Sequence, residues 1–263
     1  MCSSDLRQAN PKLRTYEQIV FTTIGLWFDL ARKPLDDPRV RRAMALALDP
    51  EDQIARYQGG AVRSGFIPAF MRDFSWSQEK LRERFKPDLE GARKLLAEAG
   101  VRPGDLKFNM KTANIFQQDA EVAQKQLEAI GVSATISVDN PVFNPIFQRS
   151  EFELAFGSPG GVIFPSWWMG DLMRASSAPK HLRPLAPEME ALAIAQGKEL
   201  DLARRKAIID QMQERLYELM PFVPQVSRLY YHVVSCRLRN ASQVVPTYNP
   251  PLVKEAWLDP TGC

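Results

Sequence analysis

The sequence predicts an α/β fold built around a mixed sheet. The main observation is a strand, a helix and a second strand in direct succession between Leu106 and Val138. Two helix starts of the form Asp-Pro, at Asp37 and Asp49, add helices outside that unit. The chain has 263 residues, of which 45% are hydrophobic, so it can bury a core without a disulfide or metal to hold it.

The first third of the chain alternates between predicted strands and short helices. Residues 16–30 are rich in β-branched and aromatic residues and predict one or two strands that end before Pro34. A helix follows Asp37, with Val40, Met44 and Leu48 on its buried face. A second helix begins at Pro50, runs to about residue 57 and stops at a Gly-Gly pair. Residues 61–86 show no clear period, and we expect a long surface loop there.

The middle of the chain carries the clearest pattern. Asp88 caps a third helix that ends at Gly100. Apolar and polar residues then alternate over 106–111 and again over 132–138, with an amphipathic helix between them. Strand, crossover helix and strand in this order predict two parallel strands joined by a right-handed connection.

The last part of the chain is predicted to complete the sheet and add a helix pair. A short strand is expected at 152–156, followed by a Gly-, Pro- and Trp-rich loop to about residue 187. Helices are expected at 187–196 and 201–219. Two further strands, at 221–226 and 229–234, precede a tail that is interrupted by prolines.

Composition excludes several classes of protein. The 34 Lys and Arg against 31 Asp and Glu give a net charge of +3, too small to require a polyanionic partner. Basic residues are also interleaved with acids, as where Arg39, Arg41 and Arg42 follow Asp36 and Asp37, so we expect no nucleic-acid partner. No apolar run approaches the eighteen or so residues of a membrane span.

The cysteines and the N-terminus say little about compartment. Cys2, Cys236 and Cys263 are too few and too scattered for a disulfide framework or a zinc site, which leaves the redox compartment open. The N-terminus lacks a secretory signal, so the protein is either cytoplasmic or lacks its natural beginning. Residues Met1 to Leu6 resemble the translation of a sequencing adapter, and we expect them to make no ordered contact.

The sequence contains few residues in patterns suited to catalysis. His181 and His232 are the two histidines, and neither has a metal-ligand partner at suitable spacing, so no metal and no cofactor is expected. Ser158 follows a predicted strand in Phe-Gly-Ser-Pro-Gly-Gly, which superficially resembles a nucleophile elbow. Pro159, however, lacks the backbone N–H that would help to form an oxyanion hole. We therefore expect no enzymatic activity, with a serine hydrolase as the weakest alternative.

The segment from Gly157 to Trp168 has a composition that is costly to leave in water. Phe164, Trp167 and Trp168 stand beside flexible glycines, as in a pocket wall that stacks against a ligand. The same aromatic residues could instead fill the core beneath a loop. Both interpretations remain open at this point.

The order of motifs resembles a known family. Pro34-Leu-Asp-Asp-Pro-Arg-Val-Arg-Arg-Ala-Met-Ala-Leu-Ala-Leu-Asp49 is similar to the signature of family 5 extracellular solute-binding proteins, the peptide, nickel and opine binders of ABC importers. Four further segments agree in order and spacing: Gly59-Gly60 leading to Ile67-Pro68, Asp88 to Gly100, Gln126 to Val132, and Arg204 to Pro224. The agreement extends over residues 16–240.

The resemblance implies a two-lobed fold of the class II periplasmic-binding-protein type, of which only the C-terminal portion is present. Residues 37–220 would form the second lobe. Residues 7–34 and 221–263 would be hinge strands and remnants of the first lobe. The implied function is capture of a peptide or similar small solute between the lobes, for delivery to an ABC importer permease. Such a protein would be periplasmic or extracytoplasmic when complete, and a monomer.

The resemblance also points to ligand-contacting residues, because ligands in α/β lobes lie beyond the carboxyl ends of parallel strands. Lys111, Thr112 and Asn114 follow the first strand of the βαβ unit. The second group, after the strand at 152–156, comprises Ser158, Phe164, Trp167 and Trp168. Peptide-binding relatives commonly carry an acid here for the ligand's α-amino group, whereas this chain has none before Asp171. A ligand-sensing module of a transcriptional regulator is the alternative function.

Overall fold

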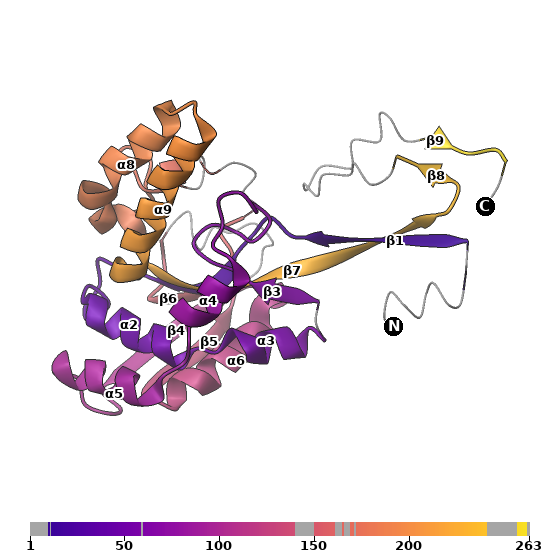
Figure 1. The fold of residues 1–263 in the computed structure, drawn as a ribbon. Helices are drawn as coiled ribbons and strands as arrows, with labels where there is room; N and C mark the ends of the chain where they lie inside the picture. Colours follow the sequence, from indigo (N-terminus) through magenta and orange to yellow (C-terminus); the bar gives the residue numbers. More distant parts are fainter. Residues whose placement is uncertain are drawn as a thin grey trace.

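A computed structural model describes residues 10, 12–58, 60–139, 150–160, 165, 169–170, 172–240 and 257–261. A seven-stranded mixed sheet forms its centre, with strand order β1-β7-β2-β6-β4-β5 and β3 beside β7. The sheet strands are β1 (Leu13–Ile19), β2 (Ile24–Phe28), β3 (Ala61–Arg63), β4 (Leu106–Thr112), β5 (Val132–Val138), β6 (Leu154–Gly157) and β7 (Phe222–Ser235). A separate pair is formed by β8 (Leu238–Arg239) and β9 (Trp257–Leu258). Figure 1 shows helices around one end of the sheet and a two-stranded ribbon leaving the other.

The α-helices are α2 (Pro38–Ala47), α3 (Pro50–Arg56), α4 (Gln78–Arg84), α5 (Leu89–Glu98), α6 (Gln117–Glu128), α8 (Ala186–Lys198) and α9 (Leu202–Leu219). Short 3₁₀ segments, η1 (Asn114–Phe116) and η3 (Lys180–Leu185), precede α6 and α8. Among the described residues, no helix has both the length and the apolar composition needed to cross a membrane.

The predicted βαβ unit is confirmed. Strands β4 and β5 pair in parallel, from Leu106 opposite Val132 to Thr112 opposite Val138. Helix α6 connects them and packs against β5. On its other side β4 pairs in parallel with β6, while β2 is antiparallel to both β6 and β7. The sheet is therefore mixed, as the sequence predicts.

The predicted helix starts are also confirmed. The carboxylates of Asp37, Asp49 and Asp88 accept hydrogen bonds from backbone N–H groups in the first turns of α2, α3 and α5, at 2.8, 3.0 and 2.9 Å. These bonds satisfy donors that the helix itself leaves unpaired. On α2 the predicted inner face is buried, since Val40, Met44 and Leu48 are 1%, 0% and 0% exposed.

Two predictions about secondary structure are wrong, one for a loop and one for a pair of strands. Residues 61–86 are not one loop, because Ala61–Arg63 forms β3 against β7 and Gln78–Arg84 forms α4. A three-residue strand that depends on a distant partner has no period of its own, and α4 contributes Leu81 as its one buried residue. The two strands expected at 221–226 and 229–234 are one continuous strand, β7. Pairing with three neighbours in turn keeps β7 extended past Pro224.

Close approach of β2 and β7 explains how a proline sits in a central strand. The pairing register shifts between Ile24 and Gly25, where Gly25 lies opposite Pro224. A Cβ atom on Gly25 would lie 2.2 Å from the carbonyl oxygen of Val223. Glycine is thus required here. Next to this contact Trp27 stacks on Phe222 at a ring distance of 4.0 Å.

An arginine is buried at the start of α2. Arg41 is 4% exposed and donates hydrogen bonds to the carbonyl oxygens of Leu35 (2.7 Å), Asp36 (3.1 Å), Met220 (2.9 Å) and Leu219. Burial lowers the pKa of Arg41 to about 10, so the side chain stays charged at neutral pH. The last carbonyls of α9 have no partner within their own helix, and Arg41 provides one. The side chain thereby joins α2 to the C-terminal end of α9.

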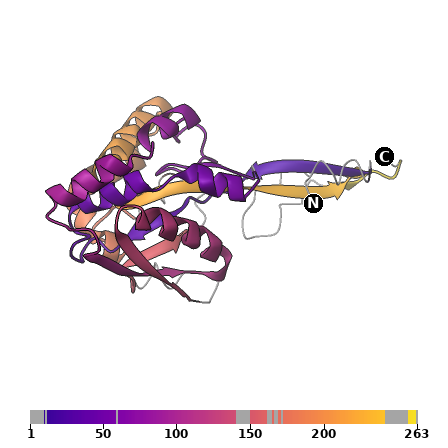
Figure 2. The same cartoon turned by 90° about the horizontal axis from the view of Figure 1, so that it is seen from below.

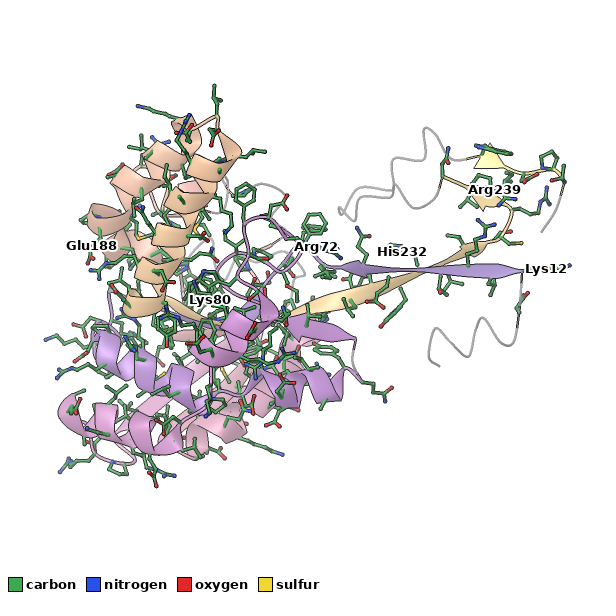
Figure 3. The ribbon with its side chains drawn as sticks, in the orientation of Figure 1. Lys12, Arg72, Lys80, Glu188, His232 and Arg239 are labelled. Atoms are coloured by element: carbon green, nitrogen blue, oxygen red, sulfur yellow. The ribbon has the colours of Figure 1, made fainter. Side chains whose placement is uncertain are left out.

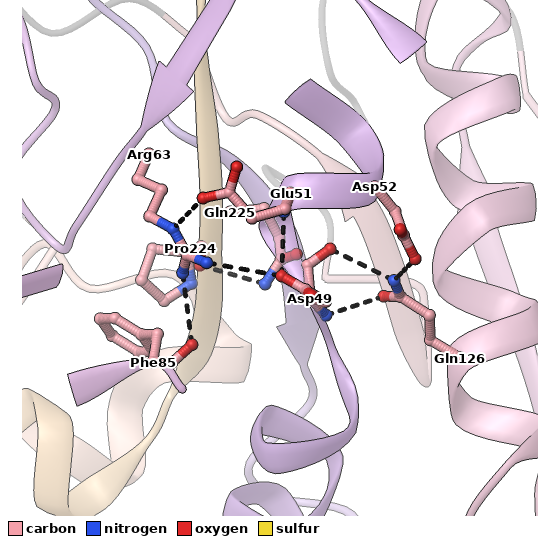
Figure 4. A network of polar contacts seen from close by, with 8 residues as sticks. All are labelled: Asp49, Glu51, Asp52, Arg63, Phe85, Gln126, Pro224 and Gln225. Carbon is pink, nitrogen blue, oxygen red and sulfur yellow. Dashed lines mark hydrogen bonds and ion pairs between the residues drawn. The ribbon is translucent and has the colours of Figure 1, made fainter. Parts of the chain in front are cut away.

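A second polar network ties α3 to its surroundings (Figure 4). Arg63 of β3 donates to Glu51 at 2.7 Å and to the carbonyl oxygen of Phe85 at 3.3 Å. On the other side Gln126 of α6 donates to Asp52 at 2.6 Å and accepts from the backbone N–H of Asp49 at 3.0 Å. The start of α3 is thus held by both β3 and α6.

The ribbon of β1 and β7 extends away from the helical body (Figure 2). Its register runs from Leu13 opposite Ser235 to Ile19 opposite Leu229. Figure 3 places His232 and Lys12 on this ribbon and Glu188 on the helix pair at the opposite end of the molecule. Tyr230 and Val233 on the ribbon are 50% and 42% exposed.

Cys236 follows the ribbon and is disulfide-bonded and buried, at 5% exposed. The two remaining cysteines, Cys2 and Cys263, lie outside the described residues, as do Met1 to Leu6.

Candidate functional site

The carboxyl ends of β4 and β6 lie side by side. Thr112 pairs with Phe156 in the parallel ladder, and its hydroxyl donates to the carbonyl oxygen of Phe156 at 2.8 Å. The segments that follow, which contain Asn114 and Ser158, therefore begin at the same edge of the sheet. Ligand sites in α/β folds form at such edges.

The predicted site residues at this edge of the sheet have different environments. Lys111 forms an ion pair with Asp139 at 3.2 Å and is 28% exposed. Ser158 is buried, and its hydroxyl donates to the carbonyl oxygen of Gly160 at 3.3 Å. Asn114 opens η1 and lines a cavity. Phe164, Trp167 and Trp168 lie outside the described residues, so their role stays a prediction.

The cavity lies between α3, the start of α6 and strand β7. Its volume is about 350 Å³, and it is lined by Arg56, Tyr57, Asn114, Ile115, Gln117, Gln118, Glu121 and Arg228. Its lining includes two guanidinium groups, three side-chain amides, one carboxylate and one aliphatic side chain. Such a mixture suits a polar ligand with a short apolar portion.

A buried carboxylate holds the cationic side of the cavity. Asp119 of α6 is 0% exposed and forms ion pairs with Arg56 and, at 2.8 Å, with Arg228. The hydroxyl of Tyr57 donates to the same carboxylate at 2.5 Å. Burial raises the pKa of Tyr57, and the Asp119 charge raises it further, so the phenol stays protonated and donates. These four side chains form the Asp119 cluster.

Aromatic rings fix the two guanidinium groups. Arg56 lies 4.1 Å from the centre of the Tyr57 ring, and Arg228 lies 4.8 Å from it. Arg228 also lies 5.1 Å from the ring of Phe116. Phe116 in turn packs against Gly157, where a Cβ atom would come within 2.9 Å of the ring and where φ is +152°. Glycine at the end of β6 therefore lets the cluster approach the sheet.

Sequence analysis did not identify Arg56, Tyr57, Asp119 or Arg228. One signal for the cluster is present in the sequence, because Asp119 lies one turn before Ala123 and two turns before Leu127 on the inner stripe of α6. An acid on the apolar face of a helix indicates a buried ion pair. Its partners come from residues 56 and 228, and no local pattern connects these positions.

The histidines contact side chains other than Ser158. The ring Nδ1 of His181 lies 2.7 Å from the hydroxyl of Ser150, and Nε2 of His232 lies 3.2 Å from the side-chain oxygen of Gln18. His181 is 1% exposed, and burial lowers its pKa to about 3. A histidine with so low a pKa is a weak general base at neutral pH.

Burial of neutral His181 predicts a loss of stability in mild acid. Its folded-state pKa lies below the ordinary value of 6.5, so on acidification the unfolded state binds the proton first. The contribution of neutral His181 to the free energy of unfolding is fully present above about pH 6.5. It decreases as the pH approaches 3, by up to about 1.4 kcal/mol per pH unit. Urea unfolding between pH 7 and 5 measures this slope. His181→Gln should flatten it, whereas His232→Gln on the ribbon should leave it unchanged; equal slopes in all three proteins would contradict the assignment.

The family model described as bacterial extracellular solute-binding proteins, family 5 Middle, matches residues 3–180 of this chain. This chain belongs to family 5. A Pseudomonas aeruginosa relative described as di/tripeptide-binding protein 2 is 30% identical over 139 residues, which cover 50% of this chain and 25% of the relative.

Solved structures at 19% identity share the fold of this chain. The AppA protein of Clostridium difficile superposes with a TM-score of 0.79 at 19% identity, over 97% of this chain and 54% of its own. A dipeptide-binding protein of Pseudoalteromonas sp. SM9913, solved with Met-Leu, gives a TM-score of 0.75 at 19% identity, over 97% of this chain and 52% of its own. The family 5 chain thus spans about half the length of these structures and a quarter of the curated relative.

Proposed function

We propose that this chain is the C-terminal portion of a binding protein that captures peptides or similar small solutes for an ABC importer. The observation that carries the proposal is the polar cavity at the carboxyl edge of a family 5 lobe. Its lining of amides and guanidinium groups can hydrogen-bond a peptide backbone and terminus. Capture without catalysis needs only that the ligand bind the closed form of the protein more tightly than the open form.

The proposed division into lobes follows the direction of the strands. Residues 37–220 would form one lobe, and residues 7–34 and 221–263 would lead into the other. The long strand β7 supports this division, because its first half lies in the body and its second half pairs with β1 outside it. Exposed Tyr230 and Val233 would then be covered by the first lobe.

An extracytoplasmic location is part of the same proposal. Disulfide bonds persist in oxidising compartments and are rare in the cytosol. The disulfide-bonded state of Cys236 supports the periplasm or cell exterior over a cytoplasmic regulator. The permease of an ABC importer would be the membrane partner.

A binding experiment on the complete protein tests the proposal. Calorimetry with the dipeptide Met-Leu and a panel of other short peptides should give saturable binding. Trp167→Ala or Trp168→Ala should weaken that binding by about 1–3 kcal/mol with little change in unfolding free energy, if the tryptophan contacts ligand. Arg102→Ala, a surface position of the same lobe that is 85% exposed, is the control.

Two results would count against the proposal. Absence of binding for every peptide tested would remove peptides as the solute class. If both tryptophan variants lose about 3–5 kcal/mol of folding stability while keeping their affinity, the loop fills the core and does not contact the ligand.

A further inference from the structure

We propose that Cys236 forms its disulfide bond with Cys263, so that the C-terminal segment is closed covalently onto the end of the ribbon formed by β1 and β7. Cys236 is disulfide-bonded and 5% exposed. The chain has two other cysteines, Cys2 and Cys263, and both lie outside the described residues. The choice between them therefore depends on which described residues lie next to Cys236. This inference goes beyond the proposed function and is independent of the solute.

The chain that follows β9 lies beside the chain that follows Cys236. Strands β8 and β9 pair antiparallel near the end of the ribbon, with Leu238 opposite Leu258 (Figure 1). One step further, the backbone N–H of Asp259 donates to the carbonyl oxygen of Arg237 at 2.8 Å. The Nε atom of Arg237 donates in return to the carbonyl oxygen of Asp259 at 2.9 Å. The antiparallel register thus continues to the residue directly after Cys236.

The side chain of Asp259 fixes a turn just before the C-terminus. One carboxylate oxygen accepts from Nε and Nη2 of Arg239 at 3.0 and 2.6 Å. The other accepts from the backbone N–H and the hydroxyl of Thr261 at 3.0 and 2.5 Å. Cys263 lies two residues beyond Thr261, and two residues span at most about 7 Å. A disulfide bond needs Cα atoms roughly 4.4–6.8 Å apart, so the turn leaves Cys263 within reach of Cys236.

The competing partner is Cys2, because the start of the chain also comes close to Cys236. The backbone N–H of Cys236 donates to the carbonyl oxygen of Lys12 at 2.7 Å. Cys2, however, lies eight residues before the first described residue, whereas Cys263 lies two residues after the last one. The entropic cost of closing a loop grows with its length, and for segments of these lengths the difference favours Cys263 by about eightfold.

Formation of the bond is an exchange with an oxidant that itself carries a disulfide, such as oxidised glutathione or a disulfide oxidoreductase. The thiolate of one cysteine attacks a sulfur atom of the oxidant, forms a mixed disulfide and releases one thiol. The thiolate of the second cysteine then attacks the cysteine sulfur of the mixed disulfide and releases the second thiol. The two cysteines lose two electrons and two protons in total, and the oxidant gains both. The product encloses residues 237–262, and therefore β8 and β9, in a covalent ring.

Peptide mapping of the 263-residue chain tests this pairing. The purified chain is incubated with oxidised glutathione, and its monomeric fraction is alkylated with iodoacetamide in denaturant and digested with trypsin without a reductant. The three cysteines fall on separate tryptic peptides, Met1–Arg7, Leu229–Arg237 and Glu255–Cys263. We expect the last two peptides to be linked until a reductant is added, and Cys2 to be alkylated. Cys2→Ser should retain the same linked pair.

A second variant tests the role of the turn. Asp259→Ala removes the acceptor that Arg239 and Thr261 share, so Cys263 is no longer held beside Cys236. The equilibrium constant for bond formation, measured against glutathione, should fall by about tenfold or more. Asp105→Ala is the matched control, because it removes an exposed ion pair with Arg102 at 3.1 Å elsewhere on the chain, and it should leave the constant unchanged.

Three outcomes would overturn the inference. The first is a link between Met1–Arg7 and Leu229–Arg237 as the main product in the unmodified chain. The second is the absence of any linked peptide, and the third is two free thiols in Cys2→Ser. An unchanged constant in Asp259→Ala would overturn the role given to the turn. All of these measurements are made without solute, so they stand or fall separately from the proposed function.

Discussion

Replacing Asp119 by asparagine should lower the free energy of unfolding by about 3–5 kcal/mol. The substitution keeps the shape of the side chain but removes the carboxylate charge. Arg56 and Arg228 would then remain in a partly buried site without their common counter-ion, at side-chain exposures of 27% and 21%. The hydroxyl of Tyr57 would lose a charged acceptor at 2.5 Å. Chemical denaturation followed by circular dichroism measures the loss.

The same helix provides the control for Asp119. Glu121 lies two residues further along α6, is exposed, and accepts a hydrogen bond from Gln117. Glu121→Gln should change stability by no more than about 0.5 kcal/mol, as expected for a surface position. In the double variant Asp119→Asn/Arg228→Gln the two losses should fall short of additivity by about 1–3 kcal/mol, because the two side chains interact. Additive losses, or equal damage from Glu121→Gln, would contradict the buried ion pair.

Replacing Arg41 by methionine should also cost about 3–5 kcal/mol, for a different reason. Methionine fills much of the same volume but donates no hydrogen bond. The carbonyl oxygens of Leu35, Asp36, Leu219 and Met220 would all lose the donor that Arg41 provides. Each buried polar group left unpaired costs about 1–3 kcal/mol, and local relaxation recovers part of that sum.

Arg42 is the matched control for Arg41. It follows directly on α2, is half-buried, and its guanidinium lies over the ring of Tyr217 at 5.5 Å. Arg42→Met should cost about 1 kcal/mol or less, the scale of one cation–π contact that keeps access to solvent. Arg41→Lys should fall between the two, because a lysine cannot reach carbonyls on both sides. Comparable losses from Arg41→Met and Arg42→Met would show that Arg41 does not join α2 to α9.

The segment Pro34–Asp49, which carries the first family motif, contains α2. Three of its residues have different structural roles. Asp37 caps the helix, Met44 enters the core, and Arg41 reaches the end of α9. From sequence, Arg41 belongs to a mixed-charge run typical of a solvated face. Its burial and its carbonyl partners Leu219 and Met220, which are 178 and 179 residues away, distinguish it from Arg42.

The sequence by itself determined the elements whose cause is local. The Asp-Pro starts of α2 and α3, the cap at Asp88, and the period-two and helical patterns of the βαβ unit depend on neighbours within a few residues. Parallel pairing could be predicted only for the two strands of the βαβ unit, and the pairing of β4 with β6, which brings Asn114 and Ser158 to one edge, is seen in the structure.

Only the tertiary structure decided the features that depend on distant partners. The short strand β3 exists because β7 offers it hydrogen bonds, and β7 stays extended through Pro224 because three strands pair with it in turn. The Asp119 cluster draws one charge from residue 56, one from residue 119 and one from residue 228. Burial, charge pairing and cavity shape are properties of atoms brought together by folding, and spacing along the chain does not encode them.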